Sequence, residues 1–81
     1  MTYIAYILLN KSRTRRYKGF TKNISNRLKE HNSGHTKSTK NDQWTIEYFE
    51  EYDNELDALK REKYFKTAAG RRWINNKFGK L

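Results

Sequence analysis

The chain has 81 residues, with 18 Lys and Arg against nine Asp and Glu, and its formal net charge is +9. This length predicts a single domain spanning residues 1–81, and the lack of Cys excludes disulfides and thiolate zinc sites. The longest apolar run, Tyr3–Leu9, is too short to cross a bilayer and lacks the pattern of an export signal. We therefore expect a cytoplasmic chain with no membrane partner.

The excess positive charge lies entirely in the first half of the chain. Residues 1–40 contain ten Lys and Arg and a single acid, Glu30, whereas residues 41–81 contain eight charges of each sign. This asymmetry indicates a polyanionic partner, although a solvated surface that keeps the protein soluble is the simpler alternative. Nucleic acid is favoured over a membrane because the basic residues lie on no helix with a lipid-seeking apolar face.

The pattern of the first half predicts a β-hairpin followed by a helix. Tyr3–Leu9 is a continuous apolar run typical of a buried strand, and Arg15–Phe20 is the second strand after a polar turn. Thr21 or Asn23 is expected to cap a helix that runs to about Asn32.

The second half begins with a polar, basic loop over His35–Gln43. Trp44–Tyr52 is rich in aromatic and β-branched residues, which predicts a third strand. Asp53 or Asn54 is expected to cap the second helix, because both residue types accept hydrogen bonds from the first backbone N–H groups.

The end of the chain is predicted to be helical in two pieces. The second helix is expected to run to about Ala69, with Gly70 ending it, and Arg71–Lys77 is expected to form a short final helix. The order strand, strand, helix, strand, helix, helix predicts an α/β (α+β) fold. We expect a three-stranded, mostly antiparallel sheet flanked by helices.

Two polar residues share the inner stripe of the first helix. Ile24, Arg27, Leu28 and His31 follow the spacing of one helical face, so Arg27 and His31 flank the apolar anchors and neighbour each other. One interpretation is structural, with Arg27 extending to solvent and His31 satisfied at the boundary of the core. The other is a functional pair, and the pattern alone leaves both open.

The second helix carries an acid on its apolar face. Glu62 shares this face with Ala58, Phe65 and Ala69. A buried carboxylate needs a cation, which is either a basic side chain or a metal ion. The structural alternative is a salt bridge with a basic neighbour on the same helix, namely Arg61, Lys63 or Lys66.

Two strand tyrosines complete the set of candidates. Tyr6 shares a strand face with Ile4 and Leu8, and Tyr17 stands two residues before Gly19. A glycine within a strand permits the close approach of another group or a ligand. Taken singly, each tyrosine is more typical of a core aromatic than of a catalytic residue.

Taken together and in this order, these residues resemble the GIY-YIG nuclease family, in particular its small stand-alone bacterial members. The two halves of the family motif stand as Ile-Ala-Tyr at residues 4–6 and Tyr-Lys-Gly at residues 17–19. Residues 26–34 resemble its Arg-containing segment, and residues 58–63 its metal-binding Glu segment. The likeness continues at residues 37–40 and 70–74, so it covers nearly the whole chain.

The sequence departs from the family pattern at three positions. Ile4 replaces the first glycine of the motif, Lys18 replaces an aliphatic residue, and Ser38 stands where an aromatic residue often precedes the Thr of the basic loop. None of these departures removes a residue that the resemblance assigns to the chemistry.

The resemblance implies a metal-dependent endonuclease that hydrolyses phosphodiester bonds in DNA, directed by structure rather than by sequence. It implies a single Mg²⁺, or another divalent cation such as Mn²⁺, with Glu62 as the protein ligand. Arg27 would pair with the scissile phosphate, and His31 would bind a tyrosine or relay its proton. Tyr6 is the candidate base, although the choice between Tyr6 and Tyr17 stays open. The implied catalytic set is Tyr6, Tyr17, Arg27, His31 and Glu62.

Basic residues near the two polar loops would bind the flanking phosphates. These residues are Lys11, Arg13, Arg15, Arg16, Lys18, Lys22, Lys37 and Lys40. The alternative function is a non-catalytic DNA- or RNA-binding module on the same fold. The sequence is equally compatible with DNA and RNA, with branched and linear substrates, and with a monomer and a dimer.

Overall fold

An antiparallel sheet of three strands forms the centre of the protein in the computed structural model, which describes residues 2–34 and 42–81. The strands are β1 (Tyr3–Asn10), β2 (Arg16–Thr21) and β3 (Trp44–Tyr52), and they lie in the order β2-β1-β3. β1 pairs antiparallel with both neighbours. The predicted fold class is therefore confirmed, with strand bounds that differ by at most one residue from those expected.

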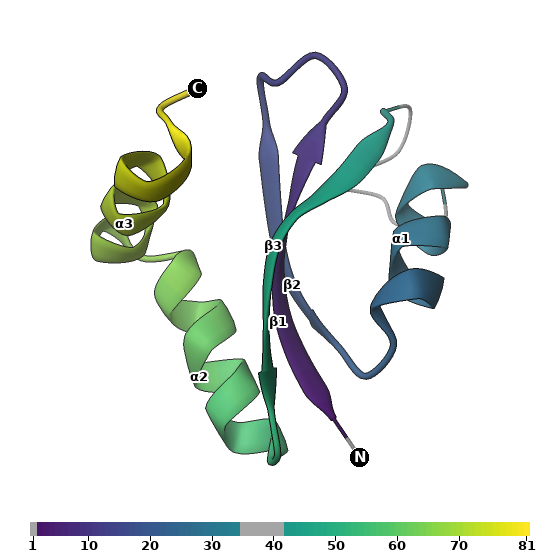
Figure 1. The fold of residues 1–81 in the computed structure, drawn as a ribbon, viewed down its shortest axis with the longest axis vertical. Coiled ribbons are helices and arrows are strands. Elements are labelled where there is room, and N and C mark those ends of the chain that lie inside the picture. The colour runs from purple at the N-terminus through teal and green to yellow at the C-terminus, as the bar shows by residue number, and fades with distance from the viewer. Residues whose placement is uncertain (1, 35–41) are drawn as a thin grey trace.

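Helices cover both faces of the sheet. Figure 1 shows α1 (Ile24–Asn32) on one side, with α2 (Glu55–Phe65) and α3 (Ala68–Phe78) on the other. Successive residues of β1 point to opposite faces, so β1 contributes to two cores. One core contains Ile4, Tyr6, Leu8 and Trp44, and the other contains Ala5, Ile7, Phe65 and Ile74.

The central position of β1 explains its sequence. A strand that is covered on both faces needs apolar residues at consecutive positions, whereas a half-exposed strand alternates. Every residue of β1 from Ile4 to Asn10 is buried. In the part of the chain that the structure describes, no helix is long and apolar enough to cross a membrane.

Asparagine side chains cap the first two helices. Asn23 Oδ1 accepts a hydrogen bond from Asn26 N at 3.1 Å, and Asn54 Oδ1 accepts one from Asp57 N at 2.9 Å. Asn23 and Asn54 are each one of the two cap candidates that the sequence offered. Thr21, the other candidate for α1, ends β2 instead, and its hydroxyl accepts a hydrogen bond from Asn23 N at 3.1 Å.

The junction between α2 and α3 differs from the expectation. α2 ends at Phe65 rather than near Ala69, and α3 starts at Ala68. Thr67 caps α3 by accepting a hydrogen bond from Gly70 N at 3.0 Å. Gly70 therefore lies inside the first turn of α3, and the prediction that it ends α2 is wrong.

Gly70 is required by close packing. A Cβ atom at this position would lie 2.9 Å from Phe65 Cα and would clash with the Tyr64 carbonyl oxygen. Such a clash involves backbone atoms, which cannot turn away as a side chain can. The glycine thus permits α3 to start directly against the last turn of α2.

We expect Gly70→Ala to destabilise the protein. Replacing a helical glycine by alanine usually stabilises by about 1 kcal/mol, but overpacking against backbone costs about 1–3 kcal/mol or more. The expected net result is a fall in melting temperature of about 10 °C for a domain of this size. A thermal melt measures it, and an unchanged or raised melting temperature would show that the junction is not tightly packed.

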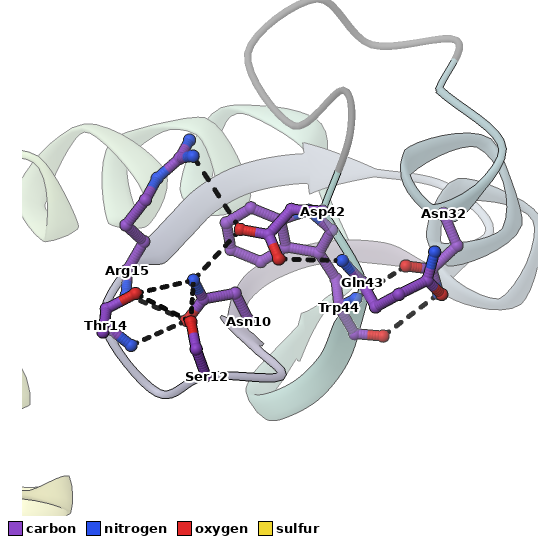
Figure 2. A network of polar contacts seen from close by, with 8 residues as sticks. All are labelled: Asn10, Ser12, Thr14, Arg15, Asn32, Asp42, Gln43 and Trp44. Carbon is purple, nitrogen blue, oxygen red and sulfur yellow. Dashed lines mark hydrogen bonds and ion pairs between the residues drawn. The ribbon is translucent and has the colours of Figure 1, made fainter.

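A buried asparagine organises the loop between β1 and β2. Asn10 is 3 % exposed, and its Oδ1 accepts hydrogen bonds from Thr14 N and Arg15 N, each at 2.9 Å. Its Nδ2 lies 3.1 Å from Ser12 Oγ and 3.0 Å from Asp42 Oδ2 (Figure 2). Asn10 therefore fixes the shape of this loop and joins it to the residues that precede β3.

A second asparagine joins α1 to β3. Asn32 Oδ1 accepts a hydrogen bond from Trp44 N at 2.6 Å, and Asn32 Nδ2 donates one to Trp44 O at 3.0 Å (Figure 2). The side-chain amide thus pairs with Trp44 much as a neighbouring strand would. Together, Asn10 and Asn32 hold the start of β3 against both the hairpin loop and the end of α1.

Candidate active site

Three polar side chains meet on the α1 face of the sheet. Tyr6 Oη lies 2.9 Å from His31 Nε2, and Arg27 Nε donates a hydrogen bond to Tyr6 Oη at 3.3 Å. Tyr6 comes from the central strand, whereas Arg27 and His31 come from successive turns of α1. The sequence left open whether Arg27 and His31 form a functional pair, and the structure shows that both contact the same phenol oxygen.

Tyr17 lies beside this group. Its ring centroid is 4.6 Å from that of His31 and 6.3 Å from that of Tyr6. The space for Tyr6 comes from Gly19, where a Cβ would stand 2.5 Å from Tyr6 Cζ. β2 is an edge strand, so the Tyr6 ring extends over Gly19 toward the open edge of the sheet.

Burial and the neighbouring charge set the protonation states of this group. Burial raises the pKa of Tyr6 to about 12, so the phenol is protonated at neutral pH. Burial and the charge of Arg27 lower the pKa of His31 below its usual 6.5, so the imidazole is neutral at pH 7. The hydrogen bond with Tyr6 raises the pKa of Arg27, which stays charged.

Glu62 approaches from the opposite side of the sheet. Its side chain is 19 % exposed, and its Oε2 accepts a hydrogen bond from Lys66 Nζ at 3.2 Å. The carboxylate is one of the charges that raise the pKa of Tyr6, after burial and Tyr17, which places it within electrostatic range of the phenol. α2, which carries Glu62, packs against β2 on the face of the sheet opposite α1.

The apolar face of α2 is narrower than the sequence indicated. Ala58 and Phe65 are fully buried, but Glu62 is half-buried at the border of that face. The basic neighbour that was the structural alternative is Lys66. Arg27 pairs with Glu30 at 3.2 Å, so among the described ion pairs Glu62 and Arg27 have separate partners.

The donor set suits a hard cation. The described residues contain no group of three or more His, Cys, Asp or Glu side chains able to hold a metal ion. Glu62 therefore offers a single carboxylate. This matches Mg²⁺, which keeps several waters and takes one or two carboxylates together with phosphate oxygens. A softer ion such as zinc would require more protein ligands.

Three of the basic residues predicted to bind phosphate lie on the loop between β1 and β2. Lys11, Arg13 and Arg15 are all exposed. Arg13 has a positive φ of 59°, and Arg15 stacks over the Trp44 ring at 5.5 Å. Because Asn10 fixes this loop, the three cations are held on a well-defined surface.

The other basic residues are placed differently. The Arg16 side chain is 5 % exposed and bonds Glu47 at 2.6 Å and the Gly79 carbonyl oxygen at 2.8 Å, so it holds the end of α3 to the sheet. Lys22 is exposed and lies over the Tyr3 ring at 5.7 Å. Lys18 is half-buried on the α3 side of β2. The remaining candidates, Lys37 and Lys40, lie outside the described residues.

Sequence reasoning missed several residues that support the site. Asn10 and Asn32 fix the loops, and Glu30 holds Arg27. A signal existed for Asn10, which is a polar residue at the end of an otherwise apolar buried strand. The other partners depend on tertiary proximity or on rotamers.

Comparison with known proteins identifies the family and agrees with the fold. The profile of the family described as the GIY-YIG catalytic domain matches residues 2–77. The solution NMR structure of the UPF0213 protein BH0048 from Bacillus halodurans is similar in fold. It aligns with 98% of this chain and 87% of its own, at a TM-score of 0.57 and 20% identity. No curated protein matches this sequence.

The family match extends from the start of β1 into the last turn of α3, so it spans the positions of all five candidate site residues. A nuclease domain acts on nucleic acid, which agrees with the positive charge of the first half. The chain belongs to the GIY-YIG catalytic domain family of nucleases.

Proposed function

We propose that this protein is a metal-dependent endonuclease that hydrolyses phosphodiester bonds in DNA. The observation that carries the proposal is the contact of Tyr6, Arg27 and His31 on one face, with Glu62 within electrostatic range of Tyr6. A purely structural core gives no reason for a charged Arg and a neutral His to contact the same buried phenol oxygen. Such groupings of perturbed side chains are typical of catalytic sites.

Arg27 is the proposed phosphate ligand. Its side chain is 34 % exposed, and its present partners are the Tyr6 hydroxyl and the exposed Glu30. A guanidinium forms two parallel hydrogen bonds with a phosphate, which are stronger than those with a neutral phenol. Arg27 would therefore turn toward a bound phosphate and stabilise the charge that develops as the phosphodiester is attacked.

Tyr6 and His31 are the proposed proton path. Tyr6 is 1 % exposed, and its hydroxyl accepts a hydrogen bond from Arg27 Nε. When Arg27 turns toward the phosphate, a water molecule would therefore gain access to the Tyr6 hydroxyl. As that water attacks phosphorus, its proton passes to Tyr6 Oη while the phenol proton passes to His31 Nε2. A phenol with a pKa of about 12 is too seldom ionised to act alone, which is why a neutral imidazole at 2.9 Å matters.

Tyr17 and Glu62 complete the proposed site. Tyr17 would position the attacking water or a phosphate oxygen from its place beside His31. Glu62 would hold Mg²⁺ or a similar ion such as Mn²⁺, which requires release of the exposed amine of Lys66 from its carboxylate. When bound, such a cation supplies Lewis-acid stabilisation of the leaving 3′ oxygen.

The flanking contacts favour a substrate recognised by its structure. Lys11, Arg13 and Arg15 on the hairpin loop would bind backbone phosphates, which carry little sequence information. Lys22 would extend these contacts past the other end of β2, and Lys37 and Lys40 are proposed for the same role. A small domain offers few residues to read base edges, so we expect cleavage governed by the shape of the DNA.

Cleavage of a substrate panel tests the proposal. Purified protein would be incubated with branched, duplex and single-stranded DNA, and with the matching RNAs, in the presence of Mg²⁺, Mn²⁺ or a chelator. We expect metal-dependent cuts in branched or duplex DNA. Binding without cleavage of any substrate would instead support a non-catalytic DNA- or RNA-binding module.

The cleavage rate is expected to depend on the protonation of His31. Its pKa lies below 6.5, so the imidazole accepts a proton at neutral pH and loses that ability as the pH falls. We expect an acid limb with a midpoint below pH 6.5. His31→Gln, which can accept a hydrogen bond but not a proton, should lower the rate about a hundredfold and remove this limb. Single-turnover rates from pH 5 to pH 8 measure both effects.

Stability must be followed over the same pH range. A histidine whose pKa is lowered by folding stabilises the protein above the unfolded pKa of about 6.5, and this contribution is lost as the pH falls. Melting curves at each pH separate unfolding from loss of catalysis. If folded His31→Gln keeps the acid limb of the wild type, His31 is not the proton acceptor.

A further inference from the structure

A second cationic site lies on the face of the sheet opposite Tyr6. It is an open pocket of about 240 Å³ between the start of β2 and α3. Five of its nine lining residues are basic and none is Asp or Glu, and the basic ones are Arg15, Arg16, Lys18, Arg71 and Lys80. A pocket smaller than a drug-sized cavity of about 300 Å³ suits a compact anion better than a larger organic ligand.

The cations of this pocket are not equivalent. Arg16 is neutralised by Glu47 at 2.6 Å, and Arg15 lies 3.8 Å from Asp42. Lys18, Arg71 and Lys80 differ, because the hydrogen bonds and ion pairs of the described residues include no acidic partner for any of these three side chains. Lys80 follows the end of α3, whereas Lys18 and Arg71 lie on β2 and α3, the two elements that form the pocket. Lys18 and Arg71 are therefore the pair best placed to bind one external anion.

Lys18 shows that the positive charge here is uncompensated. Burial lowers its pKa, and the neighbouring charges of Arg71, Arg16 and Lys66 lower it further. Like charges that are held together while partly removed from water are unfavourable. A bound anion removes this cost, and a phosphate with several acceptor oxygens matches an ammonium beside a guanidinium.

Lys18 connects the pocket to the candidate active site. Lys18 stands between Tyr17 and Gly19 on β2, so its side chain emerges one residue away from the site and on the other face of the sheet. Lys66, which bonds Glu62, is among the charges felt by Lys18. A nucleic-acid backbone that passes over the β2 edge would therefore leave Arg27 on one side of the sheet and meet Lys18 on the other.

From this arrangement we propose that Lys18 and Arg71 bind a second phosphate of the cleaved strand, on the other side of the β2 edge from the phosphate that Arg27 holds. The proposal rests on the proposed nuclease function for the identity of the strand. It adds a binding residue, Arg71, that lies outside the hairpin loop. It also means that Lys18 binds phosphate in the pocket beside α3, and not together with the basic residues of the hairpin loop.

Matched arginine variants on α3 test the proposal. Arg71 and its neighbour Arg72 are both exposed, but only Arg71 lines the pocket. In an inactive Glu62→Gln background, Arg71→Gln should weaken binding of short duplex DNA about tenfold. It should also lower the salt dependence by about one unit of slope, as expected for one lost phosphate contact. Arg72→Gln should change affinity less than about twofold.

A phosphate titration of the unmutated protein tests the same site without relying on correctly folded variants. With added inorganic phosphate, NMR signals from the Lys18 and Arg71 side chains should shift, while those of Arg72 stay in place. Equal losses of affinity for Arg71→Gln and Arg72→Gln would overturn the phosphate site, and so would selective binding of an acidic peptide over DNA at this pocket.

Failure of the nuclease proposal is distinguishable from failure of the pocket. If the protein binds DNA through Arg71 but cleaves no substrate, the phosphate-site proposal holds and the nuclease proposal fails. If the protein cleaves DNA but its Arg71 and Arg72 variants bind DNA equally well, the nuclease proposal holds and the phosphate-site proposal fails. The binding assay in the Glu62→Gln background gives its answer in either case.

Discussion

Glu62→Gln is expected to abolish cleavage and to leave nucleic-acid binding unchanged or slightly stronger. The substitution keeps the side-chain volume but removes the only carboxylate proposed to hold a metal ion. Loss of the cation removes several kcal/mol of transition-state stabilisation, so the rate should fall about a thousandfold or more. Binding should survive because the basic residues are untouched and one negative charge near the phosphate is gone. Single-turnover cleavage and fluorescence anisotropy measure the two effects.

The structure makes this variant a sharp test. The described ion-pair partner of Glu62 is the exposed Lys66, and an exposed pair contributes only about 0–1 kcal/mol. Melting temperature should therefore change by only a few degrees. Glu55→Gln is the matched control on the same helix, because Glu55 is exposed and should affect neither binding nor cleavage. Full activity in folded Glu62→Gln would remove Glu62 from the mechanism.

Most of the fold was predictable because the pattern of apolar residues in each strand indicates which of its faces are buried. The unbroken apolar run of β1 indicates burial on both faces, and the helix on one side of it is marked by Asn23 and by the spacing of Ile24 and Leu28. The boundary between α2 and α3 was not predictable. Gly70 is needed because α3 starts against the Tyr64 carbonyl, and that contact exists only in the folded protein.

The candidate site was partly predictable for a related reason. Arg27 and His31 stood out because polar residues on an apolar stripe require partners, and both now contact Tyr6. The identity of those partners was hidden, since it depends on how a strand and a helix pack. The same limit explains why the pairing of Arg27 with Glu30 and the pocket at Arg71 came only from the structure.

The placement of Gly19 links the fold to the chemistry. It lies on the edge strand directly opposite Tyr6, and any larger residue would force the Tyr6 ring away. The glycine therefore lets a central-strand phenol extend toward the open edge of the sheet. A larger residue at this position would displace the phenol from its contacts with Arg27 and His31.

Arg27→Lys is expected to lower the cleavage rate about a hundredfold to a thousandfold with little change in affinity. Lysine keeps the positive charge but lacks the planar fork that bonds two phosphate oxygens at once. Loss of one preorganised donor to a developing charge usually costs about 10²–10³ in kcat. Steady-state kinetics on the preferred DNA should therefore show a lower kcat with KM changed only a few-fold.

Arg13→Lys is the matched control, because it makes the same exchange on the exposed hairpin loop. It should leave kcat unchanged, since a backbone phosphate that only anchors the DNA accepts a point charge as well as a fork. A rise in KM at constant kcat in Arg27→Lys would mean that Arg27 binds the ground state and the transition state equally. In that case Arg27 is an anchoring residue like Arg13, and the charge that develops during attack must be stabilised by another group.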